Sequence, residues 1–356
     1  MSRRRVVPVF SLILYGALSM LFCTPANSGP PGFGNSFEEV VSLAKKEGKA
    51  RLGLTLDEAK FKVVSEGFRK KYPTIRLEYT SNVTSNAAER ISLEALAGRA
   101  EYDLINVDDD KFAHFSKMGV IVGPLDWHKI FRGEIPQEHV SPDGHYVVVS
   151  FNLRTIAYNQ GLVASEKVPK RWEDCLDPYW KGNFAVHTRA HTFVNIWRFW
   201  GETKTMEYVT RLKNNQPVWS RSMEDALIQL ASGEVRMVCG INYHHVHTLR
   251  KQDPKTSVAV AFPEAVPVAL GDTIGILKGA ENPNAAFLFA GWLASLEGQA
   301  GFDDTGKASP FLEGSEVGKA LQKAGAKPIF GGWDESNYSA ERRNKILSVF
   351  GFRPTR

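Results

Sequence analysis

The chain has 356 residues, with 44 Lys and Arg against 39 Asp and Glu, which gives a formal net charge of +5. Apolar residues make up 43% and charged residues 23%, the composition of a folded globular protein. These values exclude a disordered chain, a collagen, a polytopic membrane protein and a disulfide-dense miniprotein. At roughly 100–200 residues per domain the length predicts two domains, which need no disulfide or metal to hold their cores together.

The first 28 residues have the pattern of a secretory signal peptide. Arginines at positions 3 to 5 precede an uncharged stretch from 6 to 23, and the small residues Ala26 and Ser28 follow. This order predicts cleavage after Ser28 and a periplasmic protein. An uncleaved anchor, a lipidated Cys23 and export by the twin-arginine route are the alternatives.

This segment also carries most of the positive charge. It contains three arginines and no acidic residue, so the remaining chain has a formal charge of +2. No run of five or six like charges occurs after it, whereas a surface that binds nucleic acid needs clustered Lys and Arg. The sequence therefore predicts no nucleic-acid partner.

Helical and strand patterns alternate from residue 36 to residue 107. Ser36 is followed three residues later by Glu39, a capping-box pattern that begins a helix ending at Gly48. Strands are predicted at 51–55, 75–79 and 102–107, and further helices at 61–72 and 87–97. Such alternation indicates a mostly parallel sheet with helices on its faces, in which ligands bind beyond the carboxyl ends of the strands.

The residues that follow these three strands are polar and are the first candidates for a binding site. They are Asp57, Asp108 and the group Ser81, Asn82, Thr84 and Ser85. The group of four precedes a helix, where free backbone N–H groups favour an anion or a carboxylate. The alternative is that Ser85 or Asn86 only caps the helix, and that the aspartates at 108–110 only cap the next one and face water.

A β-rich run from 146 to 157 is too long for one ordinary strand and is expected to cross between two domains. A second α/β set follows, with helices expected at 172–176, 193–200, 206–213, 222–231 and 245–251 and strands at 184–186, 235–241 and 258–262. The strand-like segment 266–277 returns the chain to the first domain, before a helix that begins at Pro283. We expect one lobe to span 36–150 and 267–312 and the other 151–266, with a helical tail at 313–356 that the sequence assigns to neither.

No catalytic signature is present. The sequence contains no nucleophile elbow, no Walker loop, no His-Glu-x-x-His and no strand-flanked Gly-x-Gly-x-x-Gly. This lowers the expectation of an enzyme and favours a binding protein.

Five of the nine histidines fall between residues 187 and 247: His187, His191, His244, His245 and His247. Imidazole suits zinc, copper, nickel and some iron sites, so a metal site is possible. His187 and His191 are four residues apart and would share one face of a helix. The alternative is that only one member of the adjacent pair at 244 and 245 lies near a ligand. Arg189 either holds an anionic group through its fork or forms a surface salt bridge.

Cys175 and Cys239 are the only cysteines beyond residue 28. An exported compartment permits them to pair, but neither lies in a Cys-x-x-Cys spacing and the sequence does not show whether they are close. We expect two separately buried thiols, with a disulfide as the alternative.

Several segments, in one order along the chain, resemble the periplasmic solute-binding proteins of ABC importers. They include residues 45–48, 68–73, 97–104, 156–159, 282–286 and 295–299. The closest match is 168–182, which contains Trp172, Asp174, Asp177-Pro178 and Trp180 and is similar to the family's Pro-x-x-Trp-x-Asp-Leu-x-Asp-Pro-x-Trp-Lys-Gly. The resemblance covers roughly residues 37–312 and is nearest to the branch that includes ferric-iron-binding proteins.

The resemblance implies an α/β type II periplasmic binding protein, in which two lobes joined by two crossover strands close on a ligand in the cleft between them. The iron-binding members use an adjacent tyrosine pair, whereas the corresponding stretch here runs Asn242-Tyr243-His244-His245. Phenolate is a hard anionic donor and imidazole a softer neutral one, so ferric iron held in the family way is not expected. The family's other ligand loops fall on 187–192 in the second lobe and on 81–85, near Asp57, in the first.

The sequence therefore predicts a periplasmic solute-binding protein that delivers a small solute to an inner-membrane ABC permease, acts as a monomer and has no catalytic role or resident cofactor. A small organic anion is favoured, held by the helix start at 81–85, by Arg189 and by a His244–His245 pair that gains charge on protonation. A metal ion at His244 and His245 is the alternative. Two rivals are a metal-dependent periplasmic enzyme, which needs His187, His191 and His244 to converge, and a sensor that acts on a membrane receptor.

Overall fold

The computed structural model describes residues 30, 32–81, 85–107 and 111–353. The predicted signal peptide, Asn82, Thr84 and Asp108 lie outside these residues. Within the described part of the chain, every helix is too short or too polar to cross a membrane.

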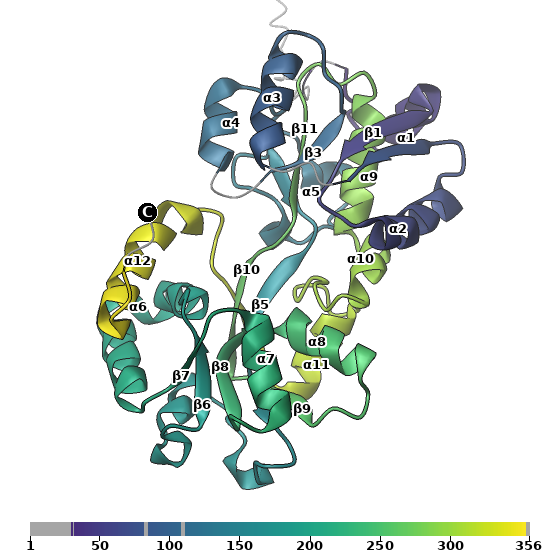
Figure 1. Ribbon diagram of the computed structural model, residues 1–356. Helices are drawn as coiled ribbons and strands as arrows, with labels where there is room; N and C mark the ends of the chain where they lie inside the picture. Colours follow the sequence, from purple (N-terminus) through teal and green to yellow (C-terminus); the bar gives the residue numbers. More distant parts are fainter. Residues whose placement is uncertain (1–29, 31, 82–84, 108–110, 354–356) are drawn as a thin grey trace, which may run out of the picture.

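The chain forms two α/β lobes, each built on its own sheet (Figure 1). The sheet of the first lobe has five strands in the order β2-β1-β3-β11-β4. Their bounds are β1 Lys49–Gly53, β2 Arg76–Thr80, β3 Leu104–Asn106, β4 Tyr146–Val148 and β11 Thr273–Ile276. The first three run parallel, whereas β11 is antiparallel to both β3 and β4.

Helices cover this first sheet, and α1 and α9 begin where the sequence predicts them, whereas α2 and α3 begin two or three residues earlier. They are α1 Phe37–Glu47, α2 Glu58–Lys71, α3 Ser85–Leu96, α4 Phe112–Met118, α5 Trp127–Ile130, α9 Pro283–Ala294 and α10 Leu296–Asp303. The start of α1 is fixed by the Ser36 hydroxyl, which accepts from the Glu39 N–H at 3.2 Å, and its end by Gly48 at φ 71°. The wholly buried helix α9 packs against α1 and supplies Phe287 and Phe289 to the core.

The sheet of the second lobe follows the order β12-β10-β5-β8-β6-β7, with β9 also paired to β5. Its strands are β5 Phe151–Asn159, β6 Phe184–His187, β7 Val218–Ser220, β8 Met237–Asn242, β9 Val258–Ala261, β10 Ala265–Leu270 and β12 Lys327–Phe330. Strands β6, β7 and β8 are parallel, so their carboxyl ends lie at one edge of the sheet.

The helices of this lobe are α6 His191–Asn214, α7 Met223–Ser232, α8 Tyr243–Gln252, α11 Glu316–Ala324 and α12 Glu335–Phe350, with a 3-10 turn η4 at Trp172–Leu176. Element α6 consists of two helical segments, as expected from 193–200 and 206–213, which are separated at Gly201, where the backbone is non-helical with φ 76°. Helix α12 packs on α6, where Leu347 and Phe350 join the core around Phe193. Helix α12 of the C-terminal tail thus lies against the second lobe, whereas α11 contacts both α10 of the first lobe and β12.

Two adjacent strand crossings join the lobes. The run from 146 divides into β4 in the first sheet and β5 in the second, as its length predicts. The return occurs at Gly271 and Asp272 instead of near 265, because β10 extends the second sheet through Leu270 by pairing with β5 (Figure 1). The Gly271 N–H donates to the Ser150 carbonyl at 3.0 Å, so the two crossings are bonded to each other.

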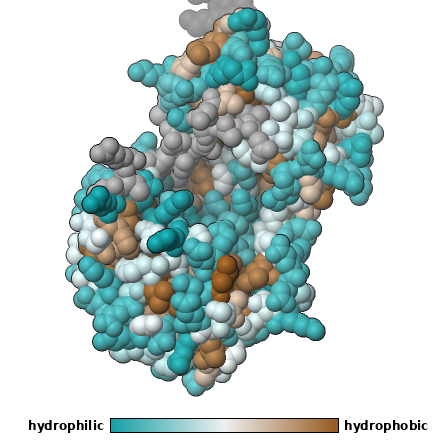
Figure 2. Space-filling view, viewed as in Figure 1, coloured by the Kyte–Doolittle hydropathy of each residue, from teal (hydrophilic) through white to brown (hydrophobic). Residues whose placement is uncertain are grey.

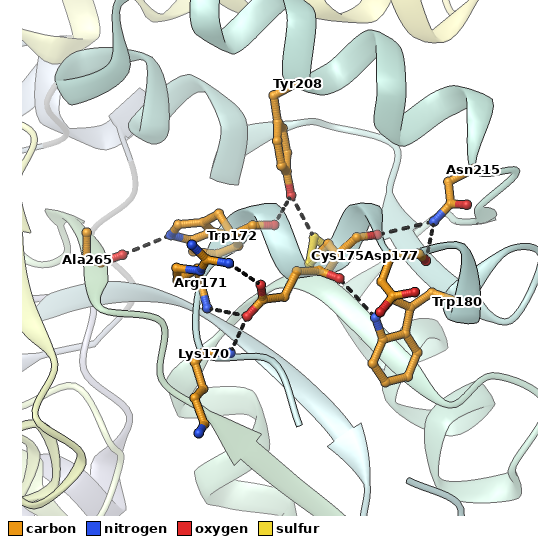
Figure 3. Close-up of a disulfide and its surroundings, with 11 residues drawn as sticks. Lys170, Arg171, Trp172, Cys175, Asp177, Trp180, Tyr208, Asn215 and Ala265 are labelled. Carbon is orange, nitrogen blue, oxygen red and sulfur yellow. Dashed lines mark hydrogen bonds and ion pairs between the residues drawn. A yellow bond between two sulfur atoms is a disulfide. The ribbon is translucent and has the colours of Figure 1, made fainter. Parts of the chain in front are cut away.

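Cys175 and Cys239 form a disulfide, so the expectation of two separate thiols is wrong. Turn η4 packs over β8 and brings the two Cα atoms to 6.3 Å, although 64 residues separate them in sequence. The Tyr208 hydroxyl donates to the Trp172 carbonyl at 2.8 Å beside the bridge (Figure 3). The bridge therefore ties the segment most similar to the family to a strand that leads into the cleft.

Candidate functional site

Three loops of the second lobe meet at the carboxyl ends of β6, β7 and β8 and enclose a cavity of about 420 Å³. Helices α6, α7 and α8 each begin directly after one of these strands, so their N-terminal backbone amides gather at the same edge. The Ser222 hydroxyl caps α7 by accepting from the Asp225 N–H at 3.0 Å. The face shown in Figure 2 is hollowed between the lobes, and the coloured surface there is mostly hydrophilic.

Three arginines and one carboxylate line this cavity: Arg154, Arg189, Arg221 and Glu224. Glu224 lies in the first turn of α7, and a backbone hydrogen bond is the main cause that lowers its pKa. Its Oε1 is 3.3 Å from Nδ1 of His245. The cationic groups outnumber the acidic one, so the cavity favours a negatively charged ligand.

Arg154 is a residue of the site that the sequence analysis missed. It belongs to β5 and is only 8% exposed, because the strand carries it under the floor of the cavity. Its Nε donates to Oδ1 of Asn195 at 2.7 Å, and its Nη1 donates to Oδ1 of Asn242. Burial lowers its pKa to about 10, so it keeps its charge at neutral pH. The signal was present in the sequence, since an arginine inside an apolar strand is expensive to bury and needs a reason.

The histidines at 187, 191 and 245 line the same cavity, but not on one helix face. His187 ends β6 and His191 begins α6, so the expectation of a shared helix is wrong, although the two ring centroids lie 6.4 Å apart. Nε2 of His187 bonds the Arg221 carbonyl at 3.2 Å, and its Nδ1 has no hydrogen-bond partner among the described residues. This nitrogen is therefore a buried polar atom whose hydrogen bond is unmade within the described part of the chain.

Burial keeps these imidazoles neutral. Desolvation lowers the pKa of His191 to about 3 and that of His244 to about 2, and it also lowers the pKa of His187 and of His245. Burial therefore opposes the expected protonation of His244 and His245, and the cationic side chains that line the cavity are the arginines.

The side chains of residues 242 to 245 have different surroundings. Asn242 accepts from Arg154, whereas the Tyr243 hydroxyl lies 3.3 Å from Nδ1 of His247 and lines a separate cavity of about 510 Å³. Nδ1 of His244 is buried with no partner among the described residues, and Lys307 contributes to the depression of the His244 pKa. Only His245 of the adjacent pair lines the arginine-rich cavity.

In the first lobe, Asp57 acts as a helix cap. Its Oδ1 accepts from the Lys60 N–H at 2.8 Å, its Oδ2 is 3.0 Å from the Lys60 ammonium, and the backbone bond is the main cause that lowers its pKa. Ser81 follows β2, and α3 begins at Ser85, two residues before the expected start. At the crossing between the lobes, the Thr55 hydroxyl donates to Asp272 at 3.0 Å.

A larger cavity, of about 1130 Å³, lies elsewhere, between Trp127, Phe287 and Trp333. None of the described candidate residues lines it. Its lining combines aromatic rings with three carboxylates and one lysine, whereas the cavity at the ends of β6 to β8 has an excess of arginine. We therefore place the candidate site in the smaller cavity.

A metal site needs several donor side chains that converge on one point. Among the described residues, no three His, Cys, Asp or Glu side chains are arranged to hold one. Structural and catalytic zinc sites need at least three protein ligands. The convergence of His187, His191 and His244 that a metal-dependent enzyme requires is therefore not found in this part of the chain.

Two lobes linked by paired crossings, with a polar cavity at the cleft, define a bacterial solute-binding protein. The sequence profile of the bacterial extracellular solute-binding proteins matches residues 54–300. The chain belongs to this family, whose members serve ABC importers.

Two bacterial proteins are similar to this chain in sequence. A Haemophilus influenzae protein of unassigned function is 29% identical over 250 residues, which cover 66% of this chain and 69% of that one. The "Iron uptake protein A1" of Synechocystis is 24% identical over 266 residues, which cover 70% of this chain and 72% of that one.

Solved structures confirm the fold. Iron-bound HitA from Pseudomonas aeruginosa is 18% identical with a TM-score of 0.61, and 85% of this chain covers 99% of it. A Trichodesmium protein, solved in complex with iron and citrate ligands, is 17% identical with a TM-score of 0.67 over 85% of this chain and 99% of that one. The expected type II architecture and the expected family are both confirmed.

Proposed function

We propose that this protein binds a small organic anion in its cleft and delivers it to an ABC permease. One observation carries the proposal: Arg154, Arg189 and Arg221 converge with three helix N-termini on a cavity that holds a single described carboxylate, Glu224. Arginine forks match carboxylate and phosphate groups, and helix N-termini stabilise the same charge.

The remaining polar groups suit the uncharged part of such a solute. Nε2 of His187 donates to a carbonyl, so its Nδ1 is an acceptor, and Glu224 is a second acceptor in the same cavity. Both can receive a hydrogen bond from a hydroxyl or an amine. The proposed ligand is therefore an anion that also carries a hydrogen-bond donor.

Closure about the two crossings would bring the first lobe onto this ligand. We propose a hinge at Ser150 and Gly271, with the start of α3 at Ser85 facing the second lobe across the cleft. The expected division into a lobe at 36–150 with 267–312 and a lobe at 151–266 remains a proposal, with its second boundary moved to 271 because β10 belongs to the second sheet. The periplasmic location after removal of residues 1–28, the monomeric state and the absence of catalysis are proposals as well. The sensor function differs from transport only in the membrane partner.

A second candidate ligand is iron carried together with an organic anion. The observation that favours it is the set of relatives, which includes an iron uptake protein and a structure with iron and citrate bound. In this case the anion would bind the arginines and complete the coordination of a metal that the described residues do not surround.

The test is calorimetric titration of the mature protein, freed of co-purified ligand by unfolding and refolding, with citrate, phosphate, ferric citrate and zinc. We expect an anion to bind and the double variant R189Q/R221Q to lose at least tenfold in affinity, since each arginine hydrogen bond to a charged group contributes about 1.5–3 kcal/mol. Arg211→Gln, an exposed change near the end of α6, is the control. Tight zinc binding that is lost in H244A/H245A, without anion binding, would overturn the proposal.

A further inference from the structure

Arg154 is a buried cation whose hydrogen-bond partners are two neutral amides. The side chains of Asn195 and Asn242 each accept one N–H from the guanidinium, and among the described residues no carboxylate lies within ion-pairing distance of it. A charge that is 8% exposed is costly to keep unless something neutralises it. The cavity opens directly onto this group, so a ligand is the one direct counter-charge that the geometry admits.

The nearest protein carboxylate acts on Arg154 through Asn195. Nδ2 of Asn195 donates to Oε1 of Glu335 at 2.8 Å, while its Oδ1 accepts from Arg154 at 2.7 Å. The amide can satisfy both bonds in only one orientation, so Glu335 fixes the acceptor that aligns the guanidinium. Glu335 is also 8% exposed and begins α12.

The start of α12 is held in place from both lobes. Asp334 forms an ion pair with Arg198 of α6 at 3.1 Å. The Trp333 indole N–H donates to the Glu138 carbonyl of the first lobe at 3.2 Å. These two contacts fix the position of Glu335. Glu335 lies outside residues 54–300, which match the family.

We propose that Arg154 binds the anionic group of the solute at the floor of the cavity and that Glu335, acting through Asn195, is a positioning residue for it. The inference rests on the proposed anion function and adds the C-terminal helix to the binding site. Glu335 has two separable effects. Its hydrogen bond orients Arg154, which strengthens binding, and its negative charge opposes the incoming anion, which weakens binding.

Two substitutions separate these effects. Glu335→Gln keeps an acceptor for Asn195 and removes the negative charge. Anion affinity should then rise about threefold, because the bound anion is no longer repelled by the carboxylate. Glu335→Ala removes both, and its affinity should be about tenfold below that of the Gln variant, because the amide and the guanidinium lose their alignment. Arg154→Gln should lose about 30-fold or more.

The experiment measures apparent Kd from the ligand-dependent rise in Tm, with citrate and inorganic phosphate as probes at constant ionic strength. Glu341→Gln and Glu341→Ala, at an exposed position of α12 paired with Lys345, are the matched controls and should bind as the wild type does. The ligand-free Tm of each variant reports whether it folds, and the Gln variant keeps the test decisive if the Ala variant is unstable.

The outcomes separate the two proposals. If neither probe stabilises the wild type, the anion function itself is rejected. If the wild type binds and both Glu335 variants match the Glu341 controls, or if Gln is as weak as Ala, the positioning role of Glu335 is rejected while the anion function stands. Tighter binding by Gln together with weaker binding by Ala supports the inference.

Discussion

At the residue scale, the chain buries titratable groups that the sequence marks only as polar. Arg154 and Glu335 are each only 8% exposed. Arg154 lies in the apolar strand β5, and Glu335 lies in a C-terminal segment in which the sequence shows no motif. The resemblance to the family's ligand loop at 187–192 predicts that His187, Arg189 and His191 lie near the site, and they line the cavity. Local patterns do not report which buried side chains meet across 140 residues, so the contact between Asn195 and Glu335 escaped prediction.

Residue burial also gives a pH prediction. His139 is fully buried, its Nε2 lies 2.6 Å from the Ser309 hydroxyl, and desolvation lowers its pKa to about 3. Because the folded pKa is below the unfolded value, stability is complete above about pH 6.5 and is lost as the pH falls towards 3, by about 2 kcal/mol at pH 5 for this one residue.

The measurement is the free energy of unfolding from denaturant titrations at pH 7 and pH 5. His139→Gln should shrink the difference between the two pH values by about 2 kcal/mol, since glutamine cannot take up the proton. His114→Gln, at an exposed position, should leave the difference unchanged. An unaltered pH dependence in His139→Gln would show that this imidazole is not the group that titrates.

At the element scale, capping residues and strand lengths were the reliable signals. The Ser36 and Ser222 caps begin α1 and α7, where the sequence places them, because the cap hydroxyl bonds within three residues. Contacts between distant elements were not predictable, and the disulfide is the example, since 64 residues separate the two cysteines. The expectation of free thiols failed because nothing local shows that η4 packs on β8.

The bridge between η4 and β8 predicts a loss of stability when it is removed. By the chain-entropy relation, a closed loop of 64 residues is expected to contribute about 4 kcal/mol. The variant C175A/C239A should therefore lose 2–5 kcal/mol, roughly the range for native disulfides, in guanidinium unfolding. Reducing agent should lower the stability of the wild type and leave the variant unchanged. A loss below about 1 kcal/mol in the variant would contradict this account.

At the scale of the whole molecule, the two lobes depend on how closely the crossings approach each other. Gly271 N–H bonds the Ser150 carbonyl, and the Ser150 hydroxyl donates to Asp272 at 2.6 Å. A Cβ at Gly271 would lie 2.4 Å from the Ser150 hydroxyl oxygen and 2.7 Å from its carbonyl oxygen. The sequence placed this return several residues early, because a continuous strand pattern hides the point at which pairing changes from one sheet to the other.

Gly271→Ala should therefore push the crossings apart and change the relation between the lobes. Because backbone atoms must move, we expect a destabilisation of about 1–3 kcal/mol and weaker binding of the probe anion, since closure needs contacts from both lobes. Small-angle scattering should show a smaller decrease in the radius of gyration on adding citrate than the wild type shows. Gly161→Ala, where the nearest contact is a side-chain oxygen at 3.3 Å, is the control. If Gly271→Ala closes on citrate as fully as Gly161→Ala does, the paired crossings are not the hinge, and the motion must be sought elsewhere between the two sheets.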